Sequence, residues 1–495
     1  MIWALAVACA AGSVPAGLRW LRVAQREHYL APSTTRFALR WWSTGPVNSS
    51  LALVALIGVV GSLWNPSIGL LVAASQVGPV GLRVKGTTSP LVWTERLRRL
   101  ALVVGALVIT LLLSGALAGS AFTVVVALFA LPVLVDVALV AMGPVERRIG
   151  NRWVEKAAAM LRSSGAQVVA ITGSYGKTTT KGYAAHLLSG VRRVVASPAS
   201  FNNRLGLARA VNEQLVPGTE VFIAEMGTYG AGEIGALCEW IQPNVAAIVA
   251  IGPVHLERFK TEVKIVAAKA EILDRAGVGV IAVDNPLLAN LANERRGRME
   301  LITVGPEMER VSVRDGRLVV DGTVIGEVPR HAMAINVCVA VGICLALDVD
   351  PAVIAARLQG LPETEHRLTV RESGSGVRII DDTYNSNPAG ANAALDRLAD
   401  LAEGGRTSVV TPGMVELGRK QAAENEAFAR RAAGEADDLI IVGATNRRSL
   451  LRGSANGSAS VTVVATRDEA VAWVRQNLAP GDTVLYENDL PDHYP

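Results

Sequence analysis

The chain has 495 residues, of which 50% are hydrophobic and 19% are charged, and its formal net charge is +4. This length is enough for about three domains of ordinary size. The small positive charge does not indicate nucleic-acid binding, because the arginines gather beside apolar segments and form no basic face with aromatic side chains between them. The four cysteines show no C-x-x-C spacing, so the sequence indicates neither a zinc site nor a disulfide framework.

The first 145 residues hold most of the apolar excess. Four stretches there are long enough, or nearly so, to cross about 30 Å of hydrocarbon: 1–18, 51–75, 100–119 and 121–143. Basic stretches lie between and after them, and such stretches favour the cytoplasmic side of a membrane. The pattern predicts an α-helical transmembrane region over residues 1–145 in the cell membrane, with membrane lipids as partners and the rest of the chain in the cytoplasm.

The number of passes depends on residues 51–80. If this segment breaks at Trp-Asn-Pro-Ser into two short passes, 51–64 and 67–80, all basic stretches face the cytoplasm and the chain crosses five times. If residues 51–74 form one helix instead, there are four passes and one basic stretch faces the opposite side. The charge pattern favours five passes.

Residues 168–181, VVAITGSYGKTTTK, begin as a buried strand and continue into a helix-compatible run. They depart from the general phosphate-loop pattern G-x-x-x-x-G-K-[ST], since an isoleucine stands at the first glycine. Gly173 and Gly176 nevertheless permit a tight turn that gathers backbone N–H groups at a helix N-terminus, where phosphate oxygens bind. Lys177 would reach the terminal phosphates and Thr178 would ligate Mg²⁺. The alternative is an ordinary glycine-rich turn, but Gly-Lys-Thr between strand and helix favours ATP binding.

Two α/β domains are predicted after the membrane region. In the first, residues 151–365, apolar runs alternate with helix-like segments, as in a parallel sheet that is covered on both faces. These runs are 168–172, 221–226, 244–252 and 278–284, and residues 311–328 indicate a small antiparallel meander. In the second, residues 370–495, strand and helix alternate again in a smaller doubly wound pattern. We expect a hinge near residues 362–376.

Polar side chains follow several of these strands, where the ligands of open α/β sheets collect. Glu225 lies at the C-terminal end of one predicted strand and His255 follows another, Lys269 lies on the next helix, and Asp382 ends a strand of the second domain. Near a triphosphate, a carboxylate, an imidazole and a lysine would hold two Mg²⁺ ions and neutralise charge during phosphoryl transfer. Taken singly, each residue has a structural explanation as a cap, a core residue or a solvated group. Their order along the chain favours a functional site.

Seven segments, in this order, resemble the Mur ligase superfamily, and within it the MurF branch, which joins D-alanyl-D-alanine to a UDP-muramoyl tripeptide. They are ITGSYGKTTTK, SFNNRLG, EMGTYGAGEI, HLERF, AKAEIL, IIDDTYNSNP and GMVELG. The resemblance covers residues 168 to about 485 and implies a phosphate-loop central domain followed by a Rossmann-like C-terminal domain. The cofactors that it implies are ATP, two Mg²⁺ ions and a carbamate formed from CO₂ on Lys269.

The resemblance also implies roles for individual residues. The catalytic residues would be Lys177, Lys269 and His255. The metal ligands would be Thr178, Glu225, His255 and the carbamylated Lys269. The residues that contact the nucleotide would be Gly173, Ser174, Gly176, Lys177, Thr178, Thr179, Asn285, Arg367, Asp382, Tyr384 and Asn385. The residues that contact substrate would be Asn202, Asn203 and Asn387.

The reaction that the resemblance implies is ATP-dependent amide formation with release of ADP. A carboxylate acceptor, carried by UDP or by a lipid, takes the γ-phosphoryl group, and the amine of an amino acid or dipeptide then attacks the acyl phosphate. Closure of the two domains protects that intermediate from water. Two alternatives stay open: a γ-glutamyl ligase resembling the poly-γ-glutamate and folylpolyglutamate synthases, and a non-catalytic membrane scaffold with a degenerate ligase domain.

Three parts of the chain depart from the MurF pattern. The usual His-Asn pair that opens the later central helix does not align, since Ala332 and Met333 stand there and His331 is one residue away. MurF enzymes begin with a soluble domain that binds the UDP-sugar, and the predicted membrane region stands in its place. The chain ends in VLYENDLPDHYP where the family has a Lys-Gly-Ser-Arg-like sequence, so Glu487, Asp489 and Asp492 replace a cationic contact. We therefore expect nucleotide chemistry to be retained, and the sequence leaves the identity of acceptor and donor open.

Overall fold

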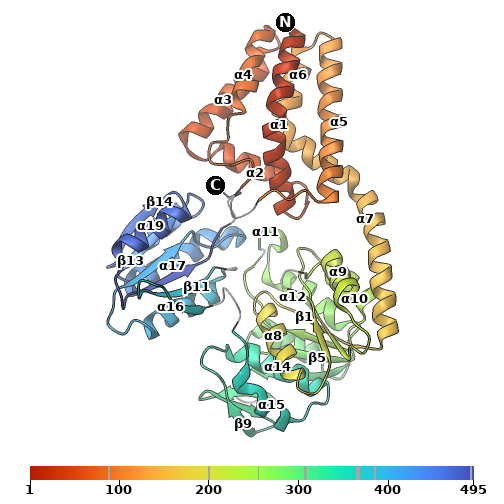
Figure 1. Cartoon of the computed structure of the whole chain (residues 1–495), viewed down its shortest axis with the longest axis vertical. Helices are drawn as coiled ribbons and strands as arrows, with labels where there is room; N and C mark the ends of the chain where they lie inside the picture. Colours follow the sequence, from red (N-terminus) through yellow and green to blue (C-terminus); the bar gives the residue numbers. More distant parts are fainter. Residues whose placement is uncertain are drawn as a thin grey trace. The chain divides into compact units, whose positions relative to one another are not determined.

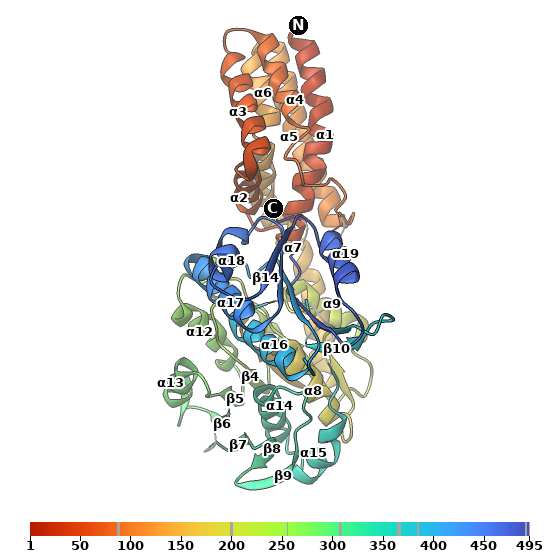
Figure 2. The ribbon, with the colours of Figure 1, turned by 90° about the vertical axis from the view of Figure 1, so that its left-hand side faces the viewer.

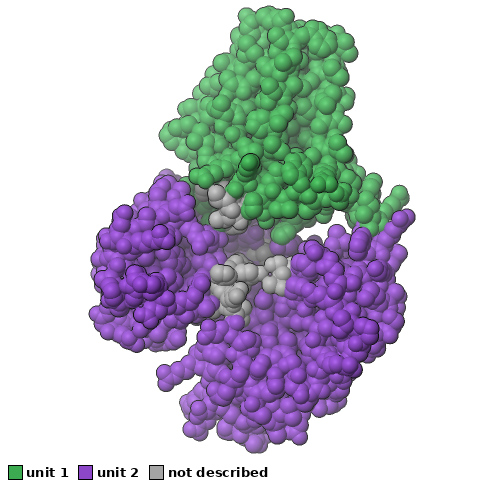
Figure 3. Space-filling model, in the orientation of Figure 1, with its two compact units in different colours: residues 1–149, 443–445, 490–495 green, residues 150–442, 446–489 purple. Residues whose placement is uncertain are grey.

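The computed structural model describes residues 1–86, 90–198, 201–254, 256–305, 309–363, 368–383, 386–490 and 493–494. The chain divides into two compact units, which Figure 3 colours separately. Unit 1 comprises residues 1–149, 443–445 and 490–495, and unit 2 comprises residues 150–442 and 446–489. Each unit has its own hydrophobic core.

Unit 1 is helical. Its elements are α1 (Ile2–Arg26), α2 (Ser33–Trp42), α3 (Gly45–Gly61), the 3-10 helix η1 (Pro66–Gly69), α4 (Leu70–Ser75), α5 (Glu95–Leu117), α6 (Ala121–Phe129) and the first part of α7 (Leu131–Ser164). Helices α1, α3, α4, α5 and α6 lie side by side (Figure 1 and Figure 2). Glycines allow close packing, because a Cβ added at Gly58 would lie 2.8 Å from Val72 and one at Gly115 would lie 2.9 Å from Val124.

Two of the described helices, α1 and α5, are long and apolar enough to cross a membrane, judged by length and composition. Two bent pairs would each make a further candidate span: α2 with α3, bent by 111°, and α6 with α7, bent by 72°. The stretch 121–143, predicted as one segment, is therefore divided. Pro132 lies in the first turn of α7, where its missing N–H group is tolerated, whereas inside one continuous helix it would remove a hydrogen bond and clash with the preceding turn. The expected four or five passes stay a prediction.

The last described residues of the chain belong to unit 1. The side chain of His493 is 3% exposed, and its Nε2 lies 3.1 Å from Oε1 of Glu27. The indole N–H of Trp41 donates a hydrogen bond of 2.8 Å to the backbone oxygen of His493. The rings of Phe37 and Tyr494 meet edge to face, with centroids 5.0 Å apart. Part of the divergent C-terminal sequence thus packs into the helical unit.

The first sheet of unit 2 has nine described strands in the order β2-β3-β1-β4-β5-β6-β7-β8-β9. They are β1 (Gln167–Thr172), β2 (Val194–Ala196), β3 (Val221–Glu225), β4 (Val245–Ile248), β5 (Val278–Ala282), β6 (Glu300–Gly305), β7 (Val311–Arg314), β8 (Arg317–Val320) and β9 (Thr323–Glu327). Every residue of β3 and β4 is buried, as expected for parallel strands covered on both faces. Strands β7, β8 and β9 form the predicted antiparallel meander.

Helices follow or flank the strands of this sheet, and the end of α7 adds Val154 and Leu161 to the core. The helices are α8 (Lys177–Leu188), α9 (Arg204–Gln214), α10 (Glu233–Ile241), α11 (Leu256–Phe259), α12 (Glu262–Ala270), η2 (Glu271–Leu273), α13 (Pro286–Arg295), α14 (Ala334–Ala346), α15 (Pro351–Arg357) and η3 (Leu358–Gly360). Strands β1, β3, β4 and β5 coincide with the predicted apolar runs, whereas β2 and β6 correspond to no predicted run.

The second sheet of unit 2 has six described strands in the order β10-β11-β15-β12-β13-β14. They are β10 (Thr369–Glu372), β11 (Arg378–Asp382), β12 (Thr407–Thr411), β13 (Asp438–Val442), β14 (Ser460–Val464) and β15 (Thr483–Glu487). The helices are α16 (Pro388–Asp400), η4 (Gly418–Lys420), α17 (Gln421–Glu435), α18 (Arg447–Ser454) and α19 (Arg467–Asn477). Strand β10 pairs antiparallel with β11 and occupies part of the segment expected as a hinge, whereas the other pairs are parallel.

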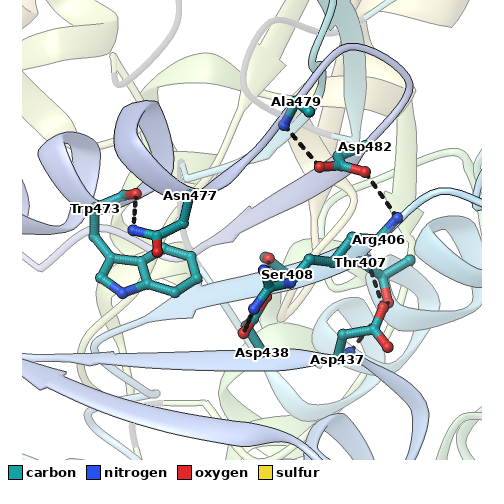
Figure 4. Close-up of polar contacts among 9 residues, drawn as sticks. All are labelled: Arg406, Thr407, Ser408, Asp437, Asp438, Trp473, Asn477, Ala479 and Asp482. Carbon is teal, nitrogen blue, oxygen red and sulfur yellow. Dashed lines mark hydrogen bonds and ion pairs between the residues drawn. The ribbon is translucent and has the colours of Figure 1, made fainter.

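Acidic side chains near the amino ends of β12, β13 and β15 form hydrogen bonds and an ion pair with nearby residues (Figure 4). Asp437 accepts hydrogen bonds from the N–H and hydroxyl groups of Thr407 at 2.8 and 3.0 Å. Asp438, which is fully buried, pairs with Arg406 at 2.6 Å, and Asp482 accepts the backbone N–H of Arg406 at 2.9 Å. Ligands of such sheets collect at the opposite, carboxyl edge. These carboxylates therefore stabilise the sheet.

Candidate active site

The turn between β1 and α8 lies at the carboxyl edge of the first sheet. Strand β1 ends at Thr172 and α8 begins at Lys177, so the predicted strand, turn and helix are all present. Gly176 has φ of +79°, and a Cβ added there would lie 2.6 Å from Oδ1 of Asn336. Only glycine suits both the left-handed backbone and this close approach. The backbone N–H groups that follow mark the N-terminus of α8, a favourable place for an anion.

The loop is braced by the segment that follows β4. The N–H of Ser174 donates to the backbone oxygen of Ala250 at 2.7 Å, and its hydroxyl donates to the oxygen of Gly252 at 3.2 Å. Ser174 is buried, so in this structure its side chain supports the loop. Thr179 is partly buried in the first turn of α8.

Glu225, the last residue of β3, is the buried carboxylate of this edge, with 3% of its surface exposed. Its Oε2 accepts hydrogen bonds from Oγ1 of Thr178 at 3.0 Å and from Nζ of Lys181 at 2.9 Å, and its Oε1 accepts one from Asn202 at 3.3 Å. Burial raises the pKa of Glu225, but the charges of Lys181 and Lys177 and the bonds from Lys181 and Thr178 outweigh burial and lower the pKa below its ordinary value. Glu225 is therefore ionised.

Two lysine amines meet at one backbone oxygen of the loop. Nζ of Lys177 donates to the oxygen of Gly173 at 2.8 Å, and Nζ of Lys269, on α12, donates to the same oxygen at 3.0 Å. Lys269 is 3% exposed. Burial, and after it the charge of Lys177, lower the pKa of Lys269 well below its ordinary value. Both causes disfavour the charged form of the Lys269 amine.

The oxygen atoms of Thr178 and Glu225 suit a magnesium ion. Their Oγ1 and Oε2 atoms lie 3.0 Å apart. Neighbouring ligands of an octahedral Mg²⁺ ion, with bonds of 2.0–2.1 Å, are also separated by about 3 Å. Within the described residues, no group of three or more His, Cys, Asp or Glu side chains gathers at one place. Mg²⁺ is usually held by one or two carboxylates together with water and phosphate oxygens, so this donor set fits it.

Three asparagines predicted as ligands cap helices in the structure. The side-chain oxygens of Asn285, Asn203 and Asn387 accept backbone N–H bonds at the starts of α13, α9 and α16, at 2.8, 3.0 and 3.0 Å. Asp382 ends β11, and its Oδ1 accepts the backbone N–H of Leu368 at 3.3 Å. The predicted residues that lie outside the described part of the chain are His255, Arg367, Tyr384 and Asn385.

The structure therefore brings Lys177, Thr178, Glu225, Lys269 and Asn202 together around one loop. Asn285 adjoins this loop, because its amide donates to the backbone oxygen of Ile251 at 3.4 Å. Ile251 lies between Ala250 and Gly252, whose backbone oxygens accept the hydrogen bonds of Ser174. Asp382 and Asn387 belong to the second sheet and its first helix.

Two buried charged residues, Lys181 and Glu487, were not among the predicted site residues. The spacing of four between Lys177 and Lys181 places them on one face of a helix, and this signal could have identified Lys181. Glu487 is fully buried and accepts hydrogen bonds from the hydroxyl groups of Ser386 and, at 2.6 Å, Thr411. It joins the carboxyl ends of β12 and β15 to the residues just before α16. Nothing in the local sequence indicates its burial.

We expect Glu487→Gln to change the stability of the protein in a pH-dependent way. Burial raises the pKa of Glu487 from 4.5 to about 7 against hydrogen bonds that lower it. Below pH 4.5 both states bind the proton; as the pH rises towards 7 the unfolded chain releases it first, which favours unfolding by on the order of 3 kcal/mol at pH 8. Glutamine cannot ionise, so the variant should gain stability over the wild type as pH rises.

The measurement is the thermal unfolding midpoint of wild type and Glu487→Gln at pH 5 and pH 8. Comparing the two proteins at each pH cancels the other titrating groups. A difference between them that is the same at both pH values would contradict the raised pKa.

Comparisons with known proteins match unit 2. The sequence matches the Mur ligase middle domain over residues 171–339 and the glutamate ligase domain of Mur ligases over residues 366–486. The chain is 32% identical over 375 residues to UDP-N-acetylmuramoyl-tripeptide–D-alanyl-D-alanine ligase of Mycobacterium tuberculosis. The matched region covers 66% of this chain and 71% of that protein.

Solved structures show the same fold. MurF from Acinetobacter baumannii matches with a TM-score of 0.60 and 25% identity, over 69% of this chain and 78% of that one. E. coli FolC, solved in complex with DHPP and ADP, matches with a TM-score of 0.51 and 18% identity, over 69% of this chain and 90% of that one. The second likeness is one of fold alone. Together with the sequence relatives, these matches show that the chain belongs to the Mur ligase family of ATP-dependent, ADP-forming peptide ligases.

Proposed function

We propose that this chain is a membrane-anchored ligase of the MurF type, which activates a substrate carboxylate as an acyl phosphate and joins it to the amine of an amino acid or dipeptide. The observation that carries the proposal is the convergence of Lys177, Thr178, Glu225 and Lys269 on the loop after β1. The proposed product is a peptide of the cell wall, because the relative from M. tuberculosis is named for the joining of D-alanyl-D-alanine to a UDP-linked tripeptide.

The loop and the N-terminus of α8 would bind the ATP phosphates. The backbone N–H groups of the loop and the dipole of α8 favour negative charge. The ammonium group of Lys177 also lies at this loop, next to the backbone oxygen of Gly173. A carboxylate oxygen of the acceptor attacks the γ-phosphorus, and ADP leaves with the electrons of the broken P–O bond. The amine then attacks the acyl carbon, and phosphate leaves with the carboxylate oxygen. Lys177 stabilises the charge on the transferring phosphoryl group.

Thr178 and Glu225 would hold one Mg²⁺ ion, and Lys269 with His255 would serve a second. The metal would supply neutralisation of the phosphate charge. Lys269 is proposed to react with CO₂: its Nζ lone pair forms an N–C bond while one C=O π bond of CO₂ breaks towards oxygen, the nitrogen releases a proton to water, and a carbamate anion results. Neutral amine is the form that this step requires, and the burial of Lys269 beside Lys177 supports it. The change replaces an amine, which cannot ligate Mg²⁺ when protonated, with a carbamate whose oxygen atoms would be ligands.

Unit 1 is proposed to anchor the ligase in the cell membrane as a multi-pass region, with unit 2 in the cytoplasm. The apolar length of α1 and α5 supports this, as do the exposed side chains of Leu102, Ile109 and Leu117 along α5. Basic residues such as Arg19, which follow the apolar segments, favour the cytoplasmic side. A membrane-bound enzyme would meet an acceptor that is held on a lipid carrier as readily as one linked to UDP.

The two alternatives have less support. A scaffold without activity gains nothing from a buried lysine and a buried carboxylate that both contact residues of a phosphate-loop turn. A γ-glutamyl ligase shares the fold with FolC, but that likeness is at 18% identity, whereas the relative at 32% identity carries the MurF-type name.

The test is product formation by the full chain in lipid nanodiscs with ATP, Mg²⁺ and D-alanyl-D-alanine. One arm supplies a UDP-linked muramoyl tripeptide, and a second supplies the same peptide on a lipid carrier. A parallel protein begins at Asn151, which keeps the α7 residues Val154 and Leu161 of the unit 2 core. We expect mass spectrometry to detect the lengthened peptide with the full chain, and less product from the shortened protein. Equal turnover of the UDP-linked acceptor by both would contradict a role for unit 1 in presenting the acceptor.

A further inference from the structure

Lys181 forms a buried ion pair inside the candidate site. It lies on α8, one turn after Lys177, and its Nζ is 2.9 Å from Oε2 of Glu225. The two side chains are only 6% and 4% exposed, so water does little to screen or replace the pair. An ionised carboxylate buried to this degree needs a cation or several donors, and Lys181 is the strongest of the three donors that contact it.

The ion pair uses the same atom that a metal would use. Oε2 of Glu225 accepts both the hydroxyl of Thr178, at 3.0 Å, and the ammonium of Lys181. The separation between Oε2 of Glu225 and Oγ1 of Thr178 suits neighbouring ligands of one Mg²⁺ ion. A divalent ion bound between them would lie close to the Lys181 ammonium, and two cations at that distance repel each other strongly in a buried site.

We propose that Lys181 is a positioning residue that acts as a resident counter-ion: its ammonium holds Glu225 in place beside Thr178, and a divalent cation must displace it from Oε2. Pro198 offers a second acceptor, because its backbone oxygen lies 3.5 Å from Nζ of Lys181. The inference rests on the proposed function, since it takes Glu225 to be a metal ligand.

A resident counter-ion and a purely structural ion pair predict opposite effects on metal binding. Removing a competing ammonium should make the metal bind more tightly, although the protein without metal loses stability because Glu225 is left buried without its cation. If the pair only maintains the shape of the site, its removal should weaken both stability and metal binding. The sign of the change in metal affinity therefore separates the two roles.

The experiment uses the full chain in nanodiscs and titrates Mn²⁺ alone, with free Mn²⁺ measured by electron paramagnetic resonance. We expect Lys181→Gln to lower the dissociation constant of the site by at least about tenfold and to lower the thermal midpoint measured without metal. Lys264→Gln, an exposed lysine on α12, is the matched control and should leave both values unchanged. Unchanged or weaker Mn²⁺ binding by Lys181→Gln would overturn the proposal.

Two further variants keep the result interpretable. Lys181→Arg retains the charge and should bind Mn²⁺ no more tightly than wild type, so tighter binding by this variant would also overturn the proposal. Glu225→Gln removes the carboxylate and identifies the signal from this site. If wild type and Glu225→Gln bind Mn²⁺ equally, the metal site of the proposed function fails. If wild type binds more tightly than Glu225→Gln but Lys181→Gln gives no gain, only the role of Lys181 fails.

Discussion

Replacing Lys177 by alanine is expected to lower ATP turnover by about a thousandfold. The ammonium group lies in the turn before α8, where its Nζ contacts the backbone oxygen of Gly173 at 2.8 Å. No other side chain of the loop carries a positive charge, so the variant loses the charge that would face the β and γ phosphates. The fold should persist, because Lys177 is partly exposed and its removal leaves the buried pair of Lys181 and Glu225 in place.

The measurement is phosphate release that depends on both peptide substrates, by the full chain in nanodiscs. Lys264→Ala is the matched control, since it removes an exposed lysine of unit 2. Melting curves of both variants should overlay that of wild type. Undiminished substrate-dependent phosphate release by Lys177→Ala would contradict the phosphate-loop assignment.

Replacing Lys269 by alanine is expected to reduce ligation by about a hundredfold or more, through loss of the proposed carbamate. Lys269 is 3% exposed and has a strongly lowered pKa, with burial as the main cause and the charge of Lys177 as the second. The truncated side chain leaves room for a small anion near Gly173. Added formate or acetate should therefore restore part of the rate in the variant and leave the wild-type rate unchanged.

Removal of dissolved CO₂ provides an independent check on the same residue. Wild type should lose activity in CO₂-free buffer and recover when bicarbonate is added, whereas Lys269→Ala should be insensitive to both. A wild-type rate in the variant without any added anion would contradict the metal role of Lys269.

Local patterns were sufficient to predict the loop and most of the first sheet. The order of apolar strand, two glycines, lysine and threonine occurs within fourteen residues, so neighbouring residues are sufficient to indicate the turn and the helix start. Glu225 was predicted because it ends a strand, and Lys269 because it lies on a helix within a family motif; the structure brings both to this loop. Their chemical roles stay proposals.

Contacts between distant parts of the chain could not be predicted in this way. Lys181 meets Glu225 across 44 residues, and His493 meets Glu27 across 466 residues. No periodicity links such positions, because the fold alone brings them together. The burial of Glu487 is of the same kind, since its two hydroxyl partners come from other parts of the second sheet.

Two other features have a local signal in the sequence. Asn203 and Asn387 precede helices and have the short polar side chain that caps an N-terminus, while their contacts with substrate stay a prediction. The break between α6 and α7 lies beside Pro132, where hydropathy alone suggests one continuous segment. In both cases the residues next to a helix end carry the structural signal, through capping or through proline, and a pattern over a longer stretch does not show it.

The most direct test of the account is to follow oxygen during the reaction. The acceptor carboxylate is labelled with ¹⁸O, and the full chain is supplied with ATP, Mg²⁺ and the amine donor. If the carboxylate attacks the γ-phosphorus and the amine then displaces phosphate, one ¹⁸O atom per amide bond formed should appear in the released phosphate. Amide formation that yields phosphate without ¹⁸O would contradict activation through an acyl phosphate.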